Sequence, residues 1–174
     1  MRIATNLEHR DFFSKNHFIE FEKLISAEDC AFLLAKTPER DLWRKNPQIK
    51  KITLSSKFAE IAASLAKKNS LRLAYDERLP AHFQAPHPLG ETTCLKHLSI
   101  SLLLILSGEK AGNGIFFLPD VYVPSADDAF LITYCEPRTM YLLDKSDPHV
   151  HDLKKLGYVF GDLLRSETHP ILYP

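Results

Sequence analysis

The chain has 174 residues, a length that fits one domain around a single core. Its composition is 45% hydrophobic and 25% charged, close to the average for globular proteins, which excludes a disordered or fibrous chain. Lysine plus arginine equals aspartate plus glutamate at 22 each, so the formal net charge is zero and no overall field attracts nucleic acid or an anionic membrane.

Cysteine use and hydropathy point to the cytoplasm. Cys30, Cys94 and Cys135 are odd in number and far apart, so they encode neither a disulfide framework nor a CxxC zinc site. Residues 1–10 lack the apolar core of a signal peptide, and the longest apolar run, 102–106, is too short to cross a bilayer. The sequence therefore predicts a cytoplasmic protein without a membrane segment.

The first part of the chain, about 1–70, reads as mainly helical. Residues 17–24 favour a short opening strand, and Ser26 then acts as the N-cap of a helix that runs toward Pro38. Residues from Ser55 or Ser56 to about Lys68 carry an apolar stripe at helical spacing and predict a second helix. Between them, residues 41–52 combine Trp43, several basic side chains and Pro47, and are interpreted as a surface loop.

After residue 70 the chain is rich in β-forming runs separated by glycine and proline. The expected strands are 71–75, 97–106, 113–118, 121–123, 129–134, 139–143 and 157–164. Regular turn residues between short strands are typical of a sandwich or barrel, and the absence of βαβ alternation disfavours a Rossmann fold. Residues 108–114 are predicted to be a hairpin turn, because they lack the Gly-Lys-Ser/Thr ending of a phosphate loop. The fold class is α+β.

The order of these segments resembles a known family. The opening run Phe-Ile-Glu-Phe-Glu-Lys-Leu-Ile-Ser from Phe18, the strand 99–106, the Gly-rich turn before Phe116, and the strand 130–133 follow the order seen in the prolyl-hydroxylase-type Fe(II)/2-oxoglutarate oxygenases. The resemblance implies a divergent bacterial member with a double-stranded β-helix, a jelly-roll or cupin-like barrel, behind two N-terminal bracing helices. It implies one domain, 1–174, with a β-helix core at about 71–164 and a tail at 165–174.

The same family implies an iron site of two histidines and one carboxylate. Its early His-x-Asp/Glu slot falls on His82-Phe83-Gln84, where an amide replaces the carboxylate, and its late slot after residue 134 holds no histidine until His149 and His151. His149 and His151 would share one face of an extended segment, although a polar turn with two solvated imidazoles is the simpler interpretation. His9-Arg10-Asp11 precedes every expected strand and is interpreted as accidental.

Three functional hypotheses follow. The first is an oxygenase-fold protein that does not perform ordinary 2-oxoglutarate-dependent hydroxylation and binds a small molecule or protein partner at the barrel mouth. The second is an active Fe(II) oxygenase that uses an unusual ligand set, His82 with His149 or His151, with Fe(II) and 2-oxoglutarate as cofactors. Its 2-oxoglutarate anchor would be Lys154, Lys155 or Arg165, none of which is fixed by spacing.

The third hypothesis is a divalent-metal-dependent DNA-binding regulator. It is supported only by a basic cluster between residues 44 and 68, and the two expected helices are too far apart in sequence for a helix-turn-helix. Nucleic acid is therefore not an expected partner. No Gly-x-Ser-x-Gly elbow or Cys-His neighbour pair indicates nucleophilic catalysis.

Overall fold

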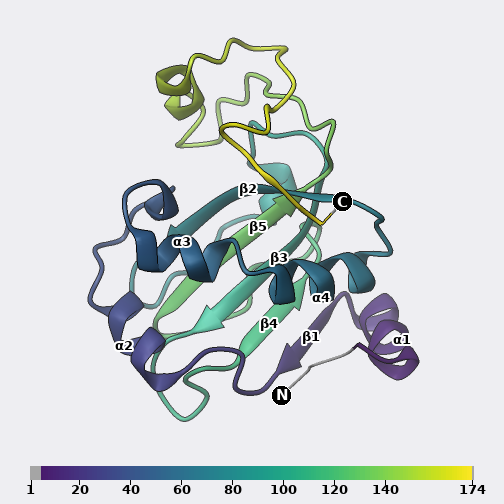
Figure 1. Ribbon diagram of the computed structural model, residues 1–174, viewed down its shortest axis with the longest axis vertical. Helices are drawn as coiled ribbons and strands as arrows, with labels where there is room; N and C mark the ends of the chain where they lie inside the picture. The colour runs from purple at the N-terminus through teal and green to yellow at the C-terminus, as the bar shows by residue number, and fades with distance from the viewer. Residues whose placement is uncertain (1–4, 174) are drawn as a thin grey trace.

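A computed structural model describes residues 5–173; residues 1–4 of the expected helical part and Pro174 of the expected tail lie outside it. One antiparallel six-stranded sheet forms the centre, with strand order β1-β4-β3-β5-β2-β6. Its strands are β1 (Phe18–Phe21), β2 (Leu71–Arg78), β3 (Leu98–Ile105), β4 (Gly114–Phe117), β5 (Ala129–Cys135) and β6 (Ile171–Tyr173). In Figure 1 the sheet is seen behind two of the helices. The mixed α and β content agrees with the expected fold class.

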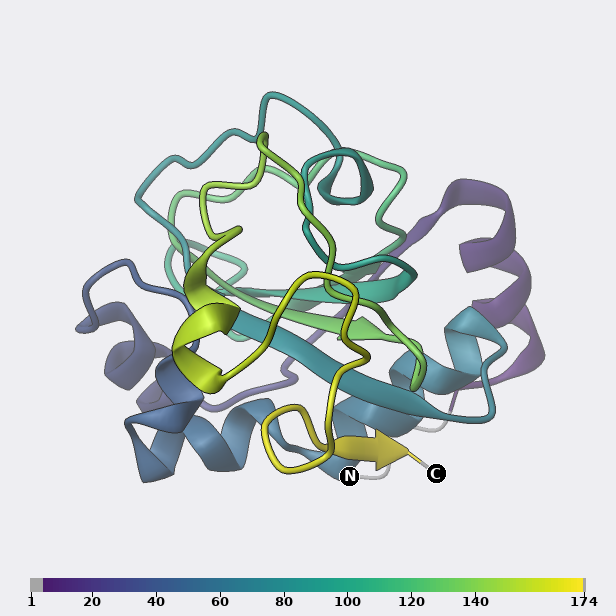
Figure 2. The ribbon, with the colours of Figure 1, turned by 90° about the horizontal axis from the view of Figure 1, so that it is seen from above.

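Helices cover one face of this sheet. The described chain contains four α-helices: α1 (Leu7–Asn16), α2 (Ala27–Leu34), α3 (Pro47–Thr53) and α4 (Ser56–Ala66). The two expected helices correspond to α2 and α4, and Ser26 caps α2 by accepting a hydrogen bond from the Asp29 backbone N–H at 3.0 Å. Figure 2 shows α3 and α4 on one side of the sheet and long irregular segments on the other.

The expectation of only two helices and a surface loop at 41–52 was wrong. Asn46 caps α3 by accepting from the backbone N–H groups of the next turn, and Pro47 occupies the first helical position, where a missing N–H is tolerated. Trp43 and Ile49 are buried, so this stretch is part of the core. The helix has only seven residues, too few for its apolar spacing to stand out from the basic side chains around it.

Irregular segments cover the second face of the sheet. Of the expected strands, 121–123, 139–143 and 157–164 are not strands in the described chain, and only the isolated bridges Leu95↔Tyr141 and Met140↔Leu163 link this layer in β fashion. These predictions were wrong because a β-rich run becomes a strand only where a neighbouring strand accepts its hydrogen bonds. Within the expected tail, β6 pairs with β2.

Two hydrophobic cores result, one on each face. The larger packs β2, β3 and β5 against α3 and α4, with Leu33, Ile61 and Phe116 among its buried members. The smaller packs the opposite side chains of the same strands against the irregular layer through Leu103, Tyr141 and others. The turn at 108–114 is present as predicted, with Gly108 and Gly112 at φ +78° and +91°. Within residues 5–173, none of the helices has the length and apolar character needed to span a membrane.

Candidate functional site

A partly enclosed cavity lies on the loop-covered face of the sheet, between β2, β5 and the irregular segments. Its volume is about 300 Å³, within the range of small-molecule sites. Much of its wall is apolar: Leu79, Phe83, Pro86, Leu89, Leu131 and Pro148. Arg40, Glu77 and His149 reach it from distant parts of the sequence, and the other polar residues of its lining are Tyr75, His87, Thr92 and Ser146. An apolar cavity with a few convergent polar groups is the usual form of a ligand site.

A bulge in β2 directs polar side chains into this cavity. The register of β2 against β5 shifts between Leu73 and Tyr75. Leu73 packs in the helix-side core, whereas Tyr75 and Glu77 line the cavity on the other face. Asp76, between them, points to the helix side and contacts Thr53. Neighbouring side chains of a strand point to opposite faces, and the bulge decides that Glu77 faces the cavity while Asp76 faces the helices.

Arg40 carries the positive charge of the cavity. Its guanidinium carbon lies 3.9 Å from the centroid of the Tyr75 ring, its Nε and Nη2 each lie 3.0 Å from Glu77 Oε2, and its Nη1 lies 3.7 Å from Asp147 Oδ1. Burial opposes the charge of Arg40, but Tyr75, Glu77 and Asp147 outweigh that effect and raise the pKa of Arg40. Burial also raises the pKa of Tyr75, which therefore keeps its phenolic proton.

His149 is held between two carboxylates. Its Nδ1 lies 2.7 Å from Asp152 Oδ2, and its Nε2 lies 3.9 Å from Glu77 Oε1. Burial acts to raise the pKa of Asp152, but hydrogen bonds from His149 and Lys155 lower it overall, so Asp152 is an ionised acceptor. The His149 ring is thus oriented toward the cavity by a bond on its far side.

Asp147 has a structural role beside the cavity. Its two carboxylate oxygens accept backbone hydrogen bonds at 2.8 Å from Cys94 and from His149. It is buried, and it closes the turn that presents His149. Asp147 therefore adds negative charge to the site while its oxygens are already engaged by the protein.

The three cysteines are not suited to nucleophilic chemistry. All are buried and free. Burial raises the pKa of Cys30 and Cys94, and it raises the pKa of Cys135 to about 12. Because the thiolate is the reactive form, these thiols are packing groups.

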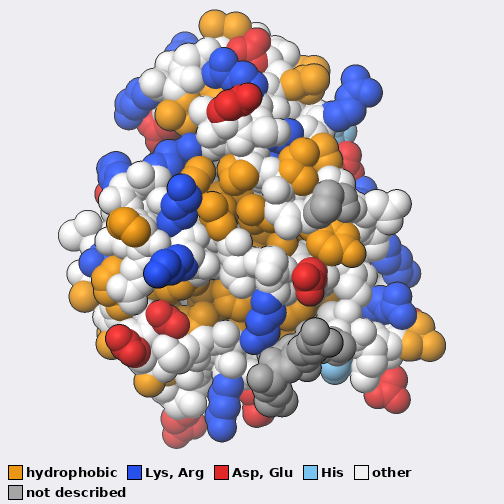
Figure 3. All heavy atoms as spheres, viewed as in Figure 1, with side chains coloured by type: hydrophobic (Ala, Val, Ile, Leu, Met, Phe, Trp, Pro, Cys, Tyr) orange, Lys and Arg blue, Asp and Glu red, His pale blue; other side chains and the backbone are white. Residues whose placement is uncertain are grey.

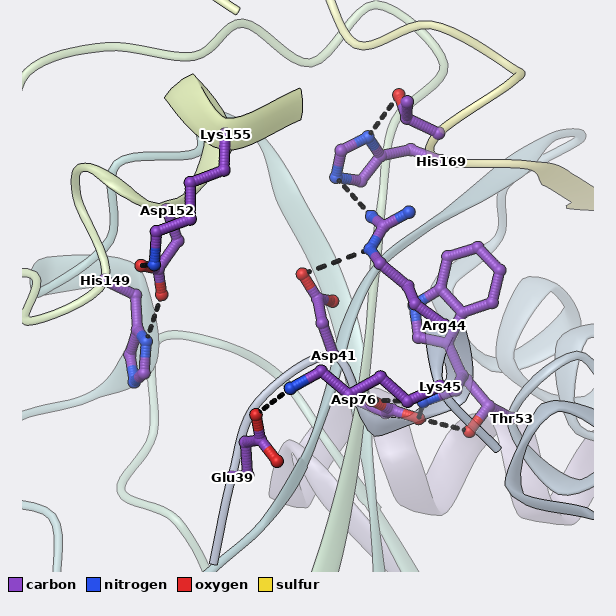
Figure 4. A network of polar contacts seen from close by, with 12 residues as sticks. Glu39, Asp41, Arg44, Lys45, Thr53, Asp76, His149, Asp152, Lys155 and His169 are labelled. Carbon is purple, nitrogen blue, oxygen red and sulfur yellow. Dashed lines mark hydrogen bonds and ion pairs between the residues drawn. The ribbon is translucent and has the colours of Figure 1, made fainter. Parts of the chain in front are cut away.

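A second polar cluster lies on the helix side of the sheet (Figure 4). Asp76 is 0% exposed, and its Oδ2 accepts hydrogen bonds from the Thr53 hydroxyl at 2.7 Å and from the Trp43 backbone N–H at 3.1 Å. Burial outweighs these bonds and raises the pKa of Asp76 to about 7. The carboxyl group is thus fully enclosed by protein partners.

The same cluster continues to the C-terminal segment. Arg44 Nε lies 3.3 Å from Asp41 Oδ2, and Arg44 Nη2 lies 3.4 Å from His169 Nε2 (Figure 4). Burial, with the nearby arginines, lowers the pKa of His169 to about 3. The contacts join the short helix η1 (Leu42–Arg44) to the segment that leads into β6, and they have a structural role.

The histidines singled out from the sequence do not gather at one point. His82 is 77% exposed on a loop, where its Nδ1 lies 3.1 Å from Asp127 Oδ1, and Gln84 is also exposed. His151 is exposed beside Phe160, at 6.2 Å between ring centroids. Of the three, only His149 lines the cavity.

The proposed anchors of 2-oxoglutarate lie outside the cavity wall. Lys154 stacks on Phe160, Lys155 pairs with Asp152, and Arg165 stacks on Tyr158. Sequence reasoning missed Arg40 and Glu77, the two charged groups of the cavity. The unusual run Tyr-Asp-Glu-Arg at the end of an otherwise apolar strand was the signal that could have found Glu77.

The residues present do not fit a non-haem iron site. Within residues 5–173, no group of three or more His, Cys, Asp or Glu side chains is arranged to hold a metal ion. His149 Nε2 and Glu77 Oε1 face each other at 3.9 Å, but no third His, Cys, Asp or Glu side chain joins them as a group of three in the described chain. Two imidazoles and one free carboxylate, the set that leaves open positions on Fe(II), do not converge in the described chain.

The fold is similar to that of two solved non-haem α-ketoglutarate-dependent enzymes, α-ketoglutarate being 2-oxoglutarate. No protein-family model and no curated protein matches the sequence. Among solved structures, the carbocyclase SnoK from nogalamycin biosynthesis is 15% identical and superposes with a TM-score of 0.75 over 97% of this chain and 96% of its own. The epimerase SnoN, solved with Fe3+, α-ketoglutarate and nogalamycin RO, is 13% identical, with a TM-score of 0.74 over 94% of this chain and 96% of its own.

CT296 from Chlamydia trachomatis is more similar in sequence. It is 26% identical over 78% of this chain and 99% of its own, with a TM-score of 0.59. The likeness to SnoK and SnoN concerns the fold, because at such identity their residues at the reaction centre do not transfer to this chain.

Some of the features weighed for DNA binding are engaged within the protein. Helices α3 and α4 follow one another closely, so the expected long separation of helices was wrong, but α4 buries Phe58, Ile61 and Leu65 against the sheet. Lys45 and Lys68 pair with Glu39 and Glu136. On the face in Figure 3 the basic side chains are separated by apolar, acidic and uncharged groups.

Proposed function

We propose that this protein is a divergent double-stranded β-helix that binds a small organic molecule in the cavity behind β2 and does not perform ordinary Fe(II)/2-oxoglutarate hydroxylation. The likeness to SnoK and SnoN supports the barrel, with the irregular layer in place of a regular second sheet. The observation that carries the proposal is the composition of the cavity. Arg40 is paired with Glu77 among mainly apolar walls, and the described residues contain no group of three metal-binding side chains there.

Ligand binding is tested with neutral aromatic probes. We expect benzyl alcohol and 2-phenylethanol to shift the backbone amide NMR signals of Leu79 and Leu131, which line the cavity. Ala85→Trp, which fills the cavity from its loop wall, should abolish these shifts. Glu109→Trp, on the exposed turn between β3 and β4, is the matched control and should leave them unchanged. Shifts that persist in Ala85→Trp would place binding elsewhere and contradict the proposal.

The enzymatic rival is an oxygenase with an unusual ligand set. It is tested by metal analysis of untagged protein and by thermal unfolding with Fe(II) or Mn(II) and 2-oxoglutarate. We expect substoichiometric metal and no joint stabilisation. Stoichiometric metal with a stabilisation by 2-oxoglutarate that is lost in His82→Ala or His149→Ala would establish the rival and overturn the proposal.

A further inference from the structure

Two hydrogen-bond acceptors face each other across the cavity. Because the ionised Asp152 accepts from His149 Nδ1, a His149 ring that carries one proton has its lone pair on Nε2. That nitrogen lies 3.9 Å from Glu77 Oε1, too far for a direct hydrogen bond. The other oxygen of Glu77, Oε2, is the one engaged by Arg40. The free oxygen of Glu77 and the lone pair of His149 are therefore available to a shared donor.

Their separation matches one tetrahedral nitrogen. A donor atom at about 2.8 Å from each acceptor sees them at an angle of about 90°, close to the spread of two N–H bonds on an sp³ nitrogen. The H–N–H angle of a planar amide NH₂ is wider and fits this geometry less well, and a carboxylate has no proton to give. We propose that Glu77 Oε1 and His149 Nε2 together bind the ammonium group of an amine. This inference rests on the proposed ligand-binding role of the cavity.

The charge of the cavity favours a cation over an anion. Arg40 contributes one positive charge, and Glu77 and Asp147, both within 4 Å of its guanidinium, contribute two negative charges. An ammonium at Glu77 offsets the unmatched negative charge. The dianion 2-oxoglutarate would instead increase the negative charge of the cavity. Arg40 is not available to bind it, because two carboxylates already engage its guanidinium.

The rest of the ligand is apolar and compact. The walls around the acceptor pair are Leu79, Phe83, Leu89 and Leu131, and a volume of about 300 Å³ is about twice that of a cavity that holds benzene. The face of the Tyr75 ring is covered by Arg40, so it is closed to a second cation. The site thus fits an aromatic or branched aliphatic amine in which a short chain links the apolar part to the nitrogen.

The test compares probes of one shape and different charge: 2-phenylethylamine, 2-phenylethanol and phenylacetate. We expect calorimetry and NMR to show that the amine binds the unmodified protein about tenfold or more tightly than the alcohol, and that phenylacetate binds least. Glu77→Gln should reduce this preference for the amine to about twofold. His149→Phe, which keeps a ring and removes the acceptor, should weaken amine binding in the same direction.

Several results would overturn the inference while leaving the proposed function intact. They are equal binding of the amine and the alcohol, tighter binding of phenylacetate, or an amine affinity unchanged in Glu77→Gln. A ¹⁵N NMR spectrum that shows both His149 nitrogens protonated near neutral pH would also overturn the inference, because the lone pair would then be absent. If neither alcohol nor amine perturbs the cavity, both the inference and the proposed function are wrong. Circular dichroism of each variant checks that the fold is retained.

Discussion

Asp76 and Glu77 are neighbours on β2, yet they belong to two different environments. Asp76 faces the helices, is fully buried, and has its carboxyl group enclosed by Thr53 and Trp43. Glu77 faces the cavity, is 18% exposed in its side chain, and has one oxygen paired with Arg40 and the other facing His149 across a gap. The two carboxyl groups differ in what is left for a ligand to contact.

The carboxyl group of Asp76 therefore serves the stability of the fold, whereas that of Glu77 is available to bind a ligand. A buried polar group is tolerated when its hydrogen bonds are made within the protein, and its loss is then felt as lost stability. A partly exposed group with an unused acceptor contributes less to folding and is available for recognition. Substitutions on the helix side should therefore change stability, and substitutions at Glu77 should change binding.

The largest expected effect is on the pH dependence of stability at Asp76. With a folded-state pKa of about 7 against 3.8 as the ordinary value, the folded protein holds one more proton than the unfolded chain between these pH values. The contribution of Asp76 to the free energy of unfolding is thus greatest near pH 4 and is lost as the pH rises toward 7. Urea unfolding of Asp76→Asn and the unmodified protein should give a stability difference that changes by about 4 kcal/mol between pH 4 and pH 8.

Asp120→Asn, which removes an exposed carboxylate, is the control for the loss of one negative charge. Parallel stability profiles of Asp76→Asn and the unmodified protein would show that Asp76 is ionised in the folded state, and the contrast with Glu77 would lose its basis.

His169 should act in the opposite sense. Its pKa of about 3 in the folded state lies below the ordinary 6.5, so the unfolded chain takes up a proton that the folded protein does not as the pH falls below 6.5. The stability that the neutral, buried His169 contributes is present above pH 6.5 and is lost as the pH falls below that value. His169→Gln should remove this loss, which amounts to about 3 kcal/mol between pH 7 and pH 4.

His82→Gln, at an exposed histidine, is the control and should follow the unmodified protein. Because the Asp76 and His169 contributions oppose each other, the unmodified protein should show a flatter profile than either variant. A steeper profile than both would contradict the assigned signs.

Arg40→Met tests the cavity side and should give the smallest change in stability. The methionine keeps the apolar stem beside Tyr75 but leaves Glu77 and Asp147 without their partner, so we expect a loss of about 2 kcal/mol in urea unfolding. Lys110→Met, at an ion pair whose lysine is 64% exposed, should cost about 0.5 kcal/mol or less. Adding Glu77→Gln to Arg40→Met should recover part of the loss, and no recovery would mean that the pair is not coupled.

The sequence predicted the elements whose signals are local. Ser26 followed by two acids predicted α2, and long apolar runs predicted β2, β3, β4 and β5. It missed α3 because seven residues are too few to show a period, and it placed strands at 139–143 and 157–164, where no neighbouring strand of the described chain completes a ladder. Strand formation depends on a partner, which a local pattern does not contain.

The candidate site was less predictable than the fold. His149 was singled out from the sequence, but Arg40 and Glu77 were not, because nothing local indicates that a residue before α3 meets the end of β2. What the sequence by itself determined is the succession of helical and β-rich segments, since capping residues and apolar runs act over a few neighbours. Only the tertiary structure decided which of two adjacent carboxyl groups is enclosed and which faces the cavity, because a one-residue bulge at Leu73–Tyr75 sets the side of the sheet for every residue that follows.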